Sequence, residues 1–179
     1  PTQHSVMRLR EIGLEPDLLV CRTEENHHLT QKLKKKLGLF CNVETNFVFE
    51  SPDVDTIYEI PLVLNKQEFD EAVVTRLNMD ANDSHENLHI LEKSIHRYKN
   101  PDDIVTIAIC GKYNSLQDAY KSILEAFIHA STQNNAKIKL RWIDTEKLGK
   151  KKNLEEEFSD IHGVLIPGGF GNRGIEGKI

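Results

Sequence analysis

Three features of this 179-residue sequence predict an α/β protein. Short apolar runs rich in β-branched residues, of which residues 104–110 form the clearest, are typical of buried parallel strands. Segments with apolar residues at helical spacing lie between these runs. In the second half the order is strand, helix, strand, helix, strand and then a glycine-rich loop, which is how a doubly wound sheet begins.

The overall composition argues against several classes of protein. Hydrophobic residues make up 39% of the chain, as in an ordinary globular protein, and the formal net charge of -5 argues against a nucleic-acid partner. Two basic runs, residues 32–36 and 147–152, are typical of solvated surfaces. No apolar run approaches the roughly 18 residues of a membrane span, and no signal peptide is visible. We therefore expect a cytoplasmic protein that binds neither nucleic acid nor membrane. Because the sequence begins at Pro1 rather than Met, we interpret it as a partial chain.

The three cysteines, Cys21, Cys41 and Cys110, are widely spaced, and two of them have apolar neighbours in the sequence. This pattern predicts reduced thiols in a protein core. No histidine stands at a spacing that would indicate a zinc site or a cysteine nucleophile.

The first segment, residues 2–12, is predicted to be a helix. Its apolar residues Val6, Leu9 and Ile12 recur at helical spacing, and Gly13 stands where a helix cap is expected.

The next elements alternate between strand and helix. Residues 17–21 form a short apolar run and predict a buried strand, with Arg22 and Thr23 just past its carboxyl end. Residues 29–37 are predicted to be helical. Ligands bind at the carboxyl ends of parallel strands, so Arg22 is a candidate site residue.

A second strand is predicted over residues 46–50, followed by a loop over 51–55. Residues 67–77 then carry apolar side chains on one helical face. The loop again follows the carboxyl end of a strand, where ligands bind in an open parallel sheet.

Residues 78–103 are polar and form the best candidate for a linker. His85, His89 and His96 would share one face of a continuous helix there, which could hold a metal. A solvated helix face is the more ordinary interpretation, because no cysteine or patterned carboxylate completes a ligand set. We therefore expect no metal site in this chain.

The strand over residues 104–110 ends at Gly111 and opens the second half. A helix is predicted from a Ser115 cap to Ile128. Three short elements are expected after it: an edge or half-buried strand over 137–143, a helix over 154–158 and a buried strand over 163–166.

The last loop carries glycines at 168, 169, 171, 174 and 177. Residues 169–174 match the pattern Gly-x-Gly-x-x-Gly, but they follow the last strand and lack the downstream acid of a dinucleotide site. A P-loop needs Ser or Thr after its lysine, whereas Ile179 follows Lys178. Two interpretations are left open: a loop whose main-chain N–H groups hold an anion or oxyanion, or a tight turn without a ligand.

Several strings, in order along the whole chain, closely resemble the CTP synthase family. They are residues 1–6 (PTQHSV), 37–41 (LGLFC), 53–58 (DVDTIY), 111–113 (GKY) with 118–120 (DAY), and 167–177 (PGGFGNRGIEG). The resemblance implies an N-terminal P-loop-type amidoligase domain and a C-terminal class I glutamine amidotransferase domain. In such enzymes ATP phosphorylates O4 of UTP, and ammonia from glutamine displaces the phosphate to give CTP in pyrimidine biosynthesis.

The resemblance also implies domain boundaries. Residues 1–77 would be the end of the synthetase domain, residues 78–103 the interdomain linker, and residues 104–179 the start of the glutaminase domain. The linker suggested by composition falls where the family needs one.

The resemblance assigns two nucleotide sites to the first half. Residues implied to contact UTP or CTP are Pro1, Thr2, Gln3 and Lys36. Residues implied to contact ATP are Arg22, Pro52, Asp53 and Val54.

In the second half the resemblance implies an oxyanion hole at Gly168 and Gly169, where main-chain N–H groups stabilise the tetrahedral intermediate. Arg173, Gly174 and Glu176 would belong to a loop that couples the two domains. The nucleophilic cysteine and the His-Glu pair of the family have no counterpart in this chain, nor do its magnesium carboxylates. These 179 residues alone are therefore expected to be inactive.

The family further implies ATP with Mg²⁺, GTP as an allosteric activator, the substrates UTP and glutamine, and a homotetramer. Two alternatives remain open from the sequence. One is a stand-alone class I glutamine amidotransferase-like protein joined to an unrelated module. The other is a catalytically dead assembly protein that retains nucleotide sites.

Overall fold

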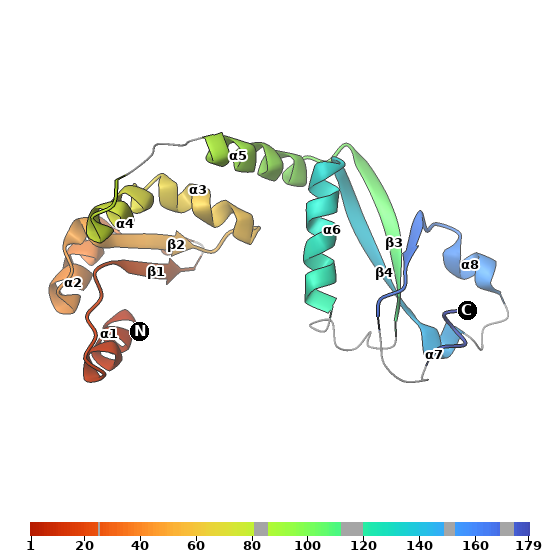
Figure 1. Cartoon of the computed structure of the whole chain (residues 1–179), viewed down its shortest axis with the longest axis horizontal. Helices are drawn as coiled ribbons and strands as arrows, with labels where there is room; N and C mark the ends of the chain where they lie inside the picture. The colour runs from red at the N-terminus through yellow and green to blue at the C-terminus, as the bar shows by residue number, and fades with distance from the viewer. Residues whose placement is uncertain (25, 81–85, 112–119, 149–152, 169–173) are drawn as a thin grey trace. The chain divides into compact units, whose positions relative to one another are not determined.

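The computed structural model describes residues 1–24, 26–80, 86–111, 120–148, 153–168 and 174–179. The chain divides into two compact units, Pro1–Glu92 and Lys93–Ile179 (Figure 1). Each unit contains a parallel sheet with helices packed on it. The predicted α/β class with parallel sheets is confirmed. No helix within these described ranges is long and apolar enough to cross a membrane.

The first unit is built on two parallel strands, β1 (Leu19–Thr23) and β2 (Val48–Pro52). Leu19 pairs with Val48, and Thr23 pairs with Pro52. The helical elements of this unit are α1 (Thr2–Glu11), α2 (Gln31–Cys41), α3 (Ile60–Asn65), α4 (Phe69–Leu77) and the 3₁₀ turns η1 (Thr45–Phe47) and η2 (Ile57–Glu59).

Apolar side chains from α1, α2 and both strands form the core of the first unit: Val6, Leu19, Cys21, Cys41, Val43 and Val48. Helix α2 begins at Thr30, whose hydroxyl accepts the Leu33 N–H at 3.3 Å, and it ends at Asn42 in the left-handed conformation.

Both strands of the first unit lie two residues later than the sequence predicted. The 3₁₀ turn η1 precedes β2, so β2 begins only at Val48. The parallel pairing of the two strands then continues as far as Thr23 and Pro52. Arg22 and Thr23 are therefore the last residues of β1 rather than loop residues. Strand ends are set by the register with the partner strand, which local sequence does not encode.

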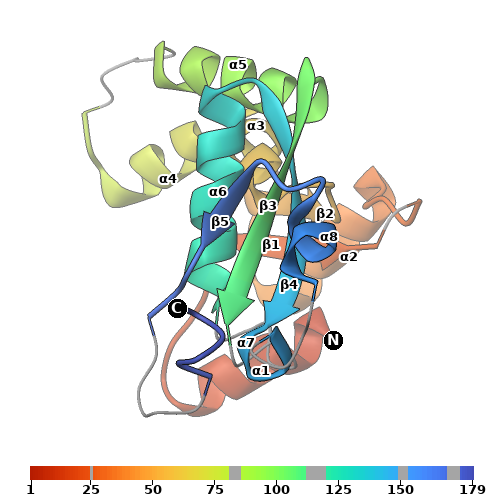
Figure 2. The same ribbon diagram turned by 90° about the vertical axis from the view of Figure 1, so that its right-hand side faces the viewer.

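The second unit contains three parallel strands in the order β4-β3-β5 (Figure 2). They are β3 (Asp103–Gly111), β4 (Ala136–Asp144) and β5 (Gly163–Leu165). Helix α6 (Lys121–Gln133) lies on one side of this sheet and α8 (Leu154–Phe158) on the other (Figure 1), as a doubly wound fold requires.

The core beneath α8 is formed by Ala108, Cys110, Ile143 and Leu148, with Phe158 and Ile161 packed against it. The predicted strands over 104–110, 137–143 and 163–166 and the helix over 154–158 all occur. Ser115, the predicted cap of the preceding helix, lies outside the described residues. The short helix α7 (Thr145–Leu148) was not predicted, because four residues show no periodicity.

Helix α5 (Glu86–Lys99) occupies most of the polar stretch 78–103, and the division between the two units falls within it. His89 lies on its surface, 3.6 Å from Glu92, and His96 is exposed. His85 is outside the described residues.

Candidate functional site

The carboxyl edge of the first sheet, where β1 and β2 end, brings together two residues that the sequence singled out. The Asp53 N–H donates to the Thr23 carbonyl at 2.9 Å, which continues the ladder one step past the strands. Arg22 Nε and Nη2 then donate to Asp53 Oδ1 at 3.0 and 2.9 Å. The Arg22 side chain is 84% exposed, so the pair contributes little to stability and both groups are accessible to a ligand. Pro52 ends β2, and Val54 is half-buried beside it.

A second cluster at this edge, centred on Glu50, was missed by the sequence analysis. The Thr23 hydroxyl donates to Glu50 Oε1 at 2.8 Å, and His28 Nδ1 lies 2.9 Å from the same oxygen. Burial by itself would raise the pKa of this carboxyl. The hydrogen bonds from Thr23, His28 and the Leu29 N–H outweigh burial and lower the pKa below its usual value.

The side chain of Gln67 fixes the main chain of Glu50. Its amide oxygen accepts the Glu50 N–H at 2.9 Å, and its amide nitrogen donates to the Glu50 carbonyl at 2.8 Å. The loop that follows β1 is therefore joined to β2 through a carboxylate that is itself held in place. The only sequence signal was a charged residue at the end of an apolar strand.

The candidate pyrimidine-nucleotide residues lie on α1 and α2. Pro1 precedes α1, and its carbonyl accepts the Ser5 N–H at 3.0 Å. The Thr2 hydroxyl donates to Cys21 Sγ at 3.9 Å and so points inward. Gln3 is exposed on α1, and Lys36 is exposed on α2.

The carboxyl edge of the second sheet carries the glycine-rich loop. The chain passes from β3 to β4 on one side and then to β5 on the other, so the crevice of the sheet lies between the ends of β3 and β5. Gly111 ends β3, and Pro167 and Gly168 follow β5. Gly168 is exposed, and a side chain there would meet no atom of the described residues within 4 Å. Gly169 lies outside the described residues.

Tyr120 is buried beside the end of β3. The residue is 4% exposed, and its ring lies 5.4 Å from that of Trp142, between centroids. A Cβ at Gly111 would stand 2.6 Å from the Tyr120 hydroxyl oxygen and 3.4 Å from Pro167 Cγ. Only glycine therefore fits at the end of β3 without moving the tyrosine.

The returning part of the loop packs on Thr145, the first residue of α7. Gly174 has a positive φ of 77°, and a Cβ there would lie 2.5 Å from Thr145 Oγ1. A Cβ at Gly177 would overlap the Thr145 carbonyl oxygen. Glu176 is exposed between them, whereas Arg173 is outside the described residues.

Cys110 is close in sequence to this crevice but does not have the properties of a nucleophile. It is 3% exposed and belongs to the core beneath α8. Burial raises the pKa of its thiol, which disfavours the reactive thiolate. Cys21 and Cys41 are also free and buried, and burial raises the pKa of each thiol.

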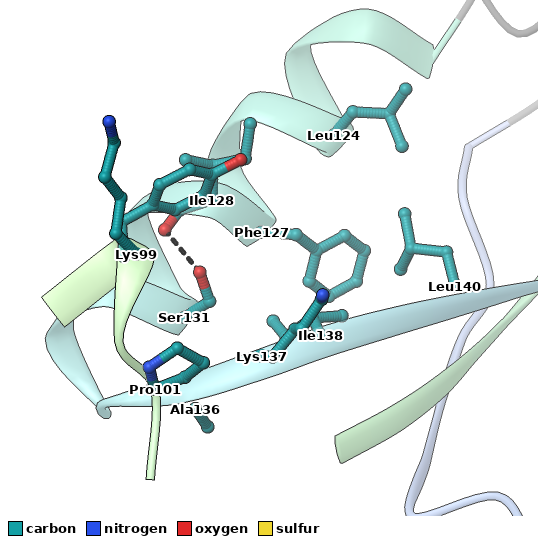
Figure 3. Close-up of a pocket in the computed structure, with 11 residues that line it drawn as sticks. Lys99, Pro101, Leu124, Phe127, Ile128, Ser131, Ala136, Lys137, Ile138 and Leu140 are labelled. Atoms are coloured by element: carbon teal, nitrogen blue, oxygen red, sulfur yellow. Dashed lines mark hydrogen bonds between the residues drawn. The ribbon is translucent and has the colours of Figure 1, made fainter. Parts of the chain in front are cut away.

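The second unit also has an apolar groove of about 340 Å³ between α6 and β4 (Figure 3). Leu124, Phe127, Ile138 and Leu140 line much of it. Two of its lining residues, Tyr98 and Ser131, carry hydroxyl groups, and that of Ser131 donates to the Ile128 carbonyl at 2.7 Å. Ala136, where β4 begins, also lines it, so the groove lies toward the amino ends of the strands and away from the crevice. No three histidine, cysteine or acidic side chains in the described ranges are grouped to hold a metal.

Comparison with known proteins covers both units. Residues 1–79 match the family model described as CTP synthase N-terminus, and residues 115–179 match that described as glutamine amidotransferase class-I. Curated relatives named CTP synthase are 49% identical in Cytophaga hutchinsonii, 46% in Syntrophus aciditrophicus and 45% in Caldanaerobacter subterraneus, each over 179 residues. Each of these three matches covers 100% of this chain but 32% of the relative, so the chain spans about a third of their length.

Proposed function

Because the chain belongs to the CTP synthase family, we propose that it forms part of a ligase that makes CTP from UTP, with ATP and with ammonia from glutamine, in pyrimidine biosynthesis. The observation that carries this proposal is the joining, in one chain, of a synthetase half and a glutaminase half, each with candidate site residues at the carboxyl edge of its sheet. Residues 1–77 are the synthetase part, 78–103 the linker and 104–179 the glutaminase part.

The ATP site is proposed at Arg22, Pro52, Asp53 and Val54. Its support is the position of these residues at the ends of paired parallel strands and the exposure of the Arg22 and Asp53 side chains. A guanidinium plane can stack on a purine, and the carboxylate can accept from a base or ribose. Mg²⁺ would accompany the ATP phosphates. The resemblance to the family implies that its carboxylate ligands lie outside the residues matched here.

The UTP or CTP site is proposed at Pro1, Thr2, Gln3 and Lys36. The exposed Lys36 ammonium suits a triphosphate, and Gln3 offers both a donor and an acceptor. The Thr2 hydroxyl is engaged with Cys21, so Thr2 would contact the nucleotide through its main chain. A cytoplasmic homotetramer and activation by GTP are proposed from the family alone.

Gly168 and Gly169 are proposed to form the oxyanion hole of the glutaminase. Main-chain N–H groups directed at the developing oxyanion stabilise the tetrahedral intermediate of amide hydrolysis. The exposure of Gly168 and its position just after β5, which pairs with β3, support this role. The loop with Arg173, Gly174 and Glu176 is proposed to couple glutamine hydrolysis to the synthetase.

The stand-alone amidotransferase alternative is not favoured, because residues 1–79 match the synthetase family model as well. A full-length chimera tests the remaining alternative, a catalytically dead protein. In it, residues 1–179 replace the matching segment of the Cytophaga hutchinsonii relative. We expect CTP formation, followed by absorbance, from UTP, ATP and glutamine. Residues 1–179 alone are expected to turn over neither glutamine nor UTP. A folded chimera without activity toward glutamine or ammonia would contradict the proposal.

A further inference from the structure

We propose that Thr145 is a positioning residue for glutamine hydrolysis, because its two oxygen atoms hold the returning part of the glycine-rich loop against the sheet. The inference rests on the proposed oxyanion role of Gly168 and Gly169. Thr145 itself contacts neither the glutamine nor the reacting atoms in this scheme.

The first support is the closeness of the contact at two separate points. The Thr145 hydroxyl oxygen lies where a side chain of Gly174 would begin, and the Thr145 carbonyl oxygen lies where a side chain of Gly177 would begin. These distances leave no room for a Cβ at either position, so only glycine fits there without moving Thr145.

The second support is the burial of Thr145. The residue is 1% exposed, and its hydroxyl oxygen is one of the few buried side-chain oxygens in the described ranges without a hydrogen-bond partner. A buried hydroxyl without a partner costs free energy that a methyl group of the same shape would not.

The third support is the closure of the loop. Lys178 Nζ donates to the Pro167 carbonyl at 3.4 Å, which joins the end of the loop to its beginning just after β5. The Glu146 N–H donates to Asp144 Oδ1 at 2.9 Å, which fixes the turn that carries Thr145. Gly168 is therefore connected to a fixed point on β4 by way of Lys178, Gly177 and Thr145.

The chimera described above allows two activities to be measured. Glutamine-dependent CTP formation needs the oxyanion hole, whereas CTP formation from added ammonia does not. Gly177→Ala is expected to lower kcat with glutamine on the order of 100-fold, because a displacement of ~1 Å in a positioning element can cost that much. The ammonia-dependent rate is expected to stay unchanged.

A rescue experiment separates positioning by Thr145 from a general loss of structure. Gly174→Ala is expected to lower the rate of glutamine hydrolysis on the order of tenfold, through the clash with Thr145 Oγ1 and its positive φ. Hydrolysis is measured here as glutamate release, so that a loss of coupling through the same loop is not counted. Adding Thr145→Ala removes that oxygen and should restore part of the rate. The same addition should not rescue Gly177→Ala, whose clash is with the backbone.

Gly13→Ala is the matched control, because Gly13 also has a positive φ, 83°, but a Cβ there would meet nothing within 4 Å. Both activities should remain intact in it. Hydrogen exchange of the 163–168 peptide gives a readout independent of catalysis and should accelerate in Gly177→Ala. Unchanged exchange, failure of the rescue, or equal loss of both activities would overturn the role of Thr145. An unmodified chimera active with ammonia but not with glutamine would instead overturn the proposed oxyanion hole.

Discussion

The carboxyl edges of the two sheets are held by different kinds of contact. In the first unit, side chains far apart in sequence are joined by hydrogen bonds and ion pairs, with Glu50 and Asp53 as the acceptors. In the second unit, the backbone itself is packed closely, and the glycines at 111, 174 and 177 lie where any side chain would clash. Charged contacts in an exposed edge adapt to substitution, whereas close packing of backbone does not. The two edges should therefore differ sharply in their tolerance of mutation.

The largest effect is expected at Gly111. Gly111→Ala directs a methyl group at the Tyr120 hydroxyl, which cannot move freely because the ring is buried against Trp142. We expect a loss of about 1–3 kcal/mol in the local stability of β3, measured by hydrogen exchange in the chimera. Tyr120→Phe in the same background removes the clashing oxygen and should recover part of the loss. If Gly111→Ala left the local stability of β3 unchanged, the second edge would be no less tolerant of substitution than the first.

A smaller effect is expected for Glu50→Gln in the first unit. The amide keeps the shape of the carboxylate but weakens the charge-assisted hydrogen bonds from Thr23 and His28, at a cost of about 1–2 kcal/mol in the stability of β2. Glu11→Gln is the matched control, because its pair with Arg8 is exposed and should contribute only a few tenths of a kcal/mol. Equal effects of the two substitutions would mean that burial of Glu50 adds nothing.

The same carboxylate should make the first unit sensitive to acid. Its folded-state pKa lies below the ordinary value of 4.5, so its stabilising contribution is complete above pH 4.5 and is lost as the pH falls through the folded pKa. The difference in stability between the parent and Glu50→Gln should therefore shrink below pH 4.5. Hydrogen exchange of β2 as a function of pH checks this. If the difference in stability between the parent and Glu50→Gln persisted in full at low pH, the lowered pKa of Glu50 would be contradicted.

The second edge also offers a substitution that should separate function from stability. A Cβ at Gly168 meets no atom of the described residues within 4 Å, so Gly168→Ala should change local stability by less than about 0.5 kcal/mol. If its N–H serves the oxyanion, the added methyl group at the mouth of the site should still lower the glutamine-dependent rate while the ammonia-dependent rate is retained. Equal rates in the variant and its parent would argue against an oxyanion role for Gly168.

The sequence predicted the location of Arg22 and Asp53, because the carboxyl ends of parallel strands meet at one edge whatever the exact register. It could not predict the Glu50 cluster, since the contact with His28 joins residues 22 positions apart and depends on the path of the loop. The role of Thr145 was hidden for a different reason. Its contacts are steric and involve two glycines, and hydrophobic periodicity contains no information on backbone approach.

Arg22→Ala in the first unit is also expected to have only a small effect on stability. The Arg22 side chain is 84% exposed, so loss of its pair with Asp53 should cost less than about 1 kcal/mol and should vary with salt.

Binding should respond differently: if the planar guanidinium contacts ATP, the KM for ATP should rise in the chimera while kcat with saturating ATP changes little. Arg8→Ala, which removes another exposed arginine pair of the same unit, is the matched control and should leave that KM unchanged. An unchanged KM for ATP in Arg22→Ala would show that the pair of Arg22 and Asp53 does not contribute to ATP binding. A loss of stability as large as that of Gly111→Ala would instead remove the contrast between the two edges.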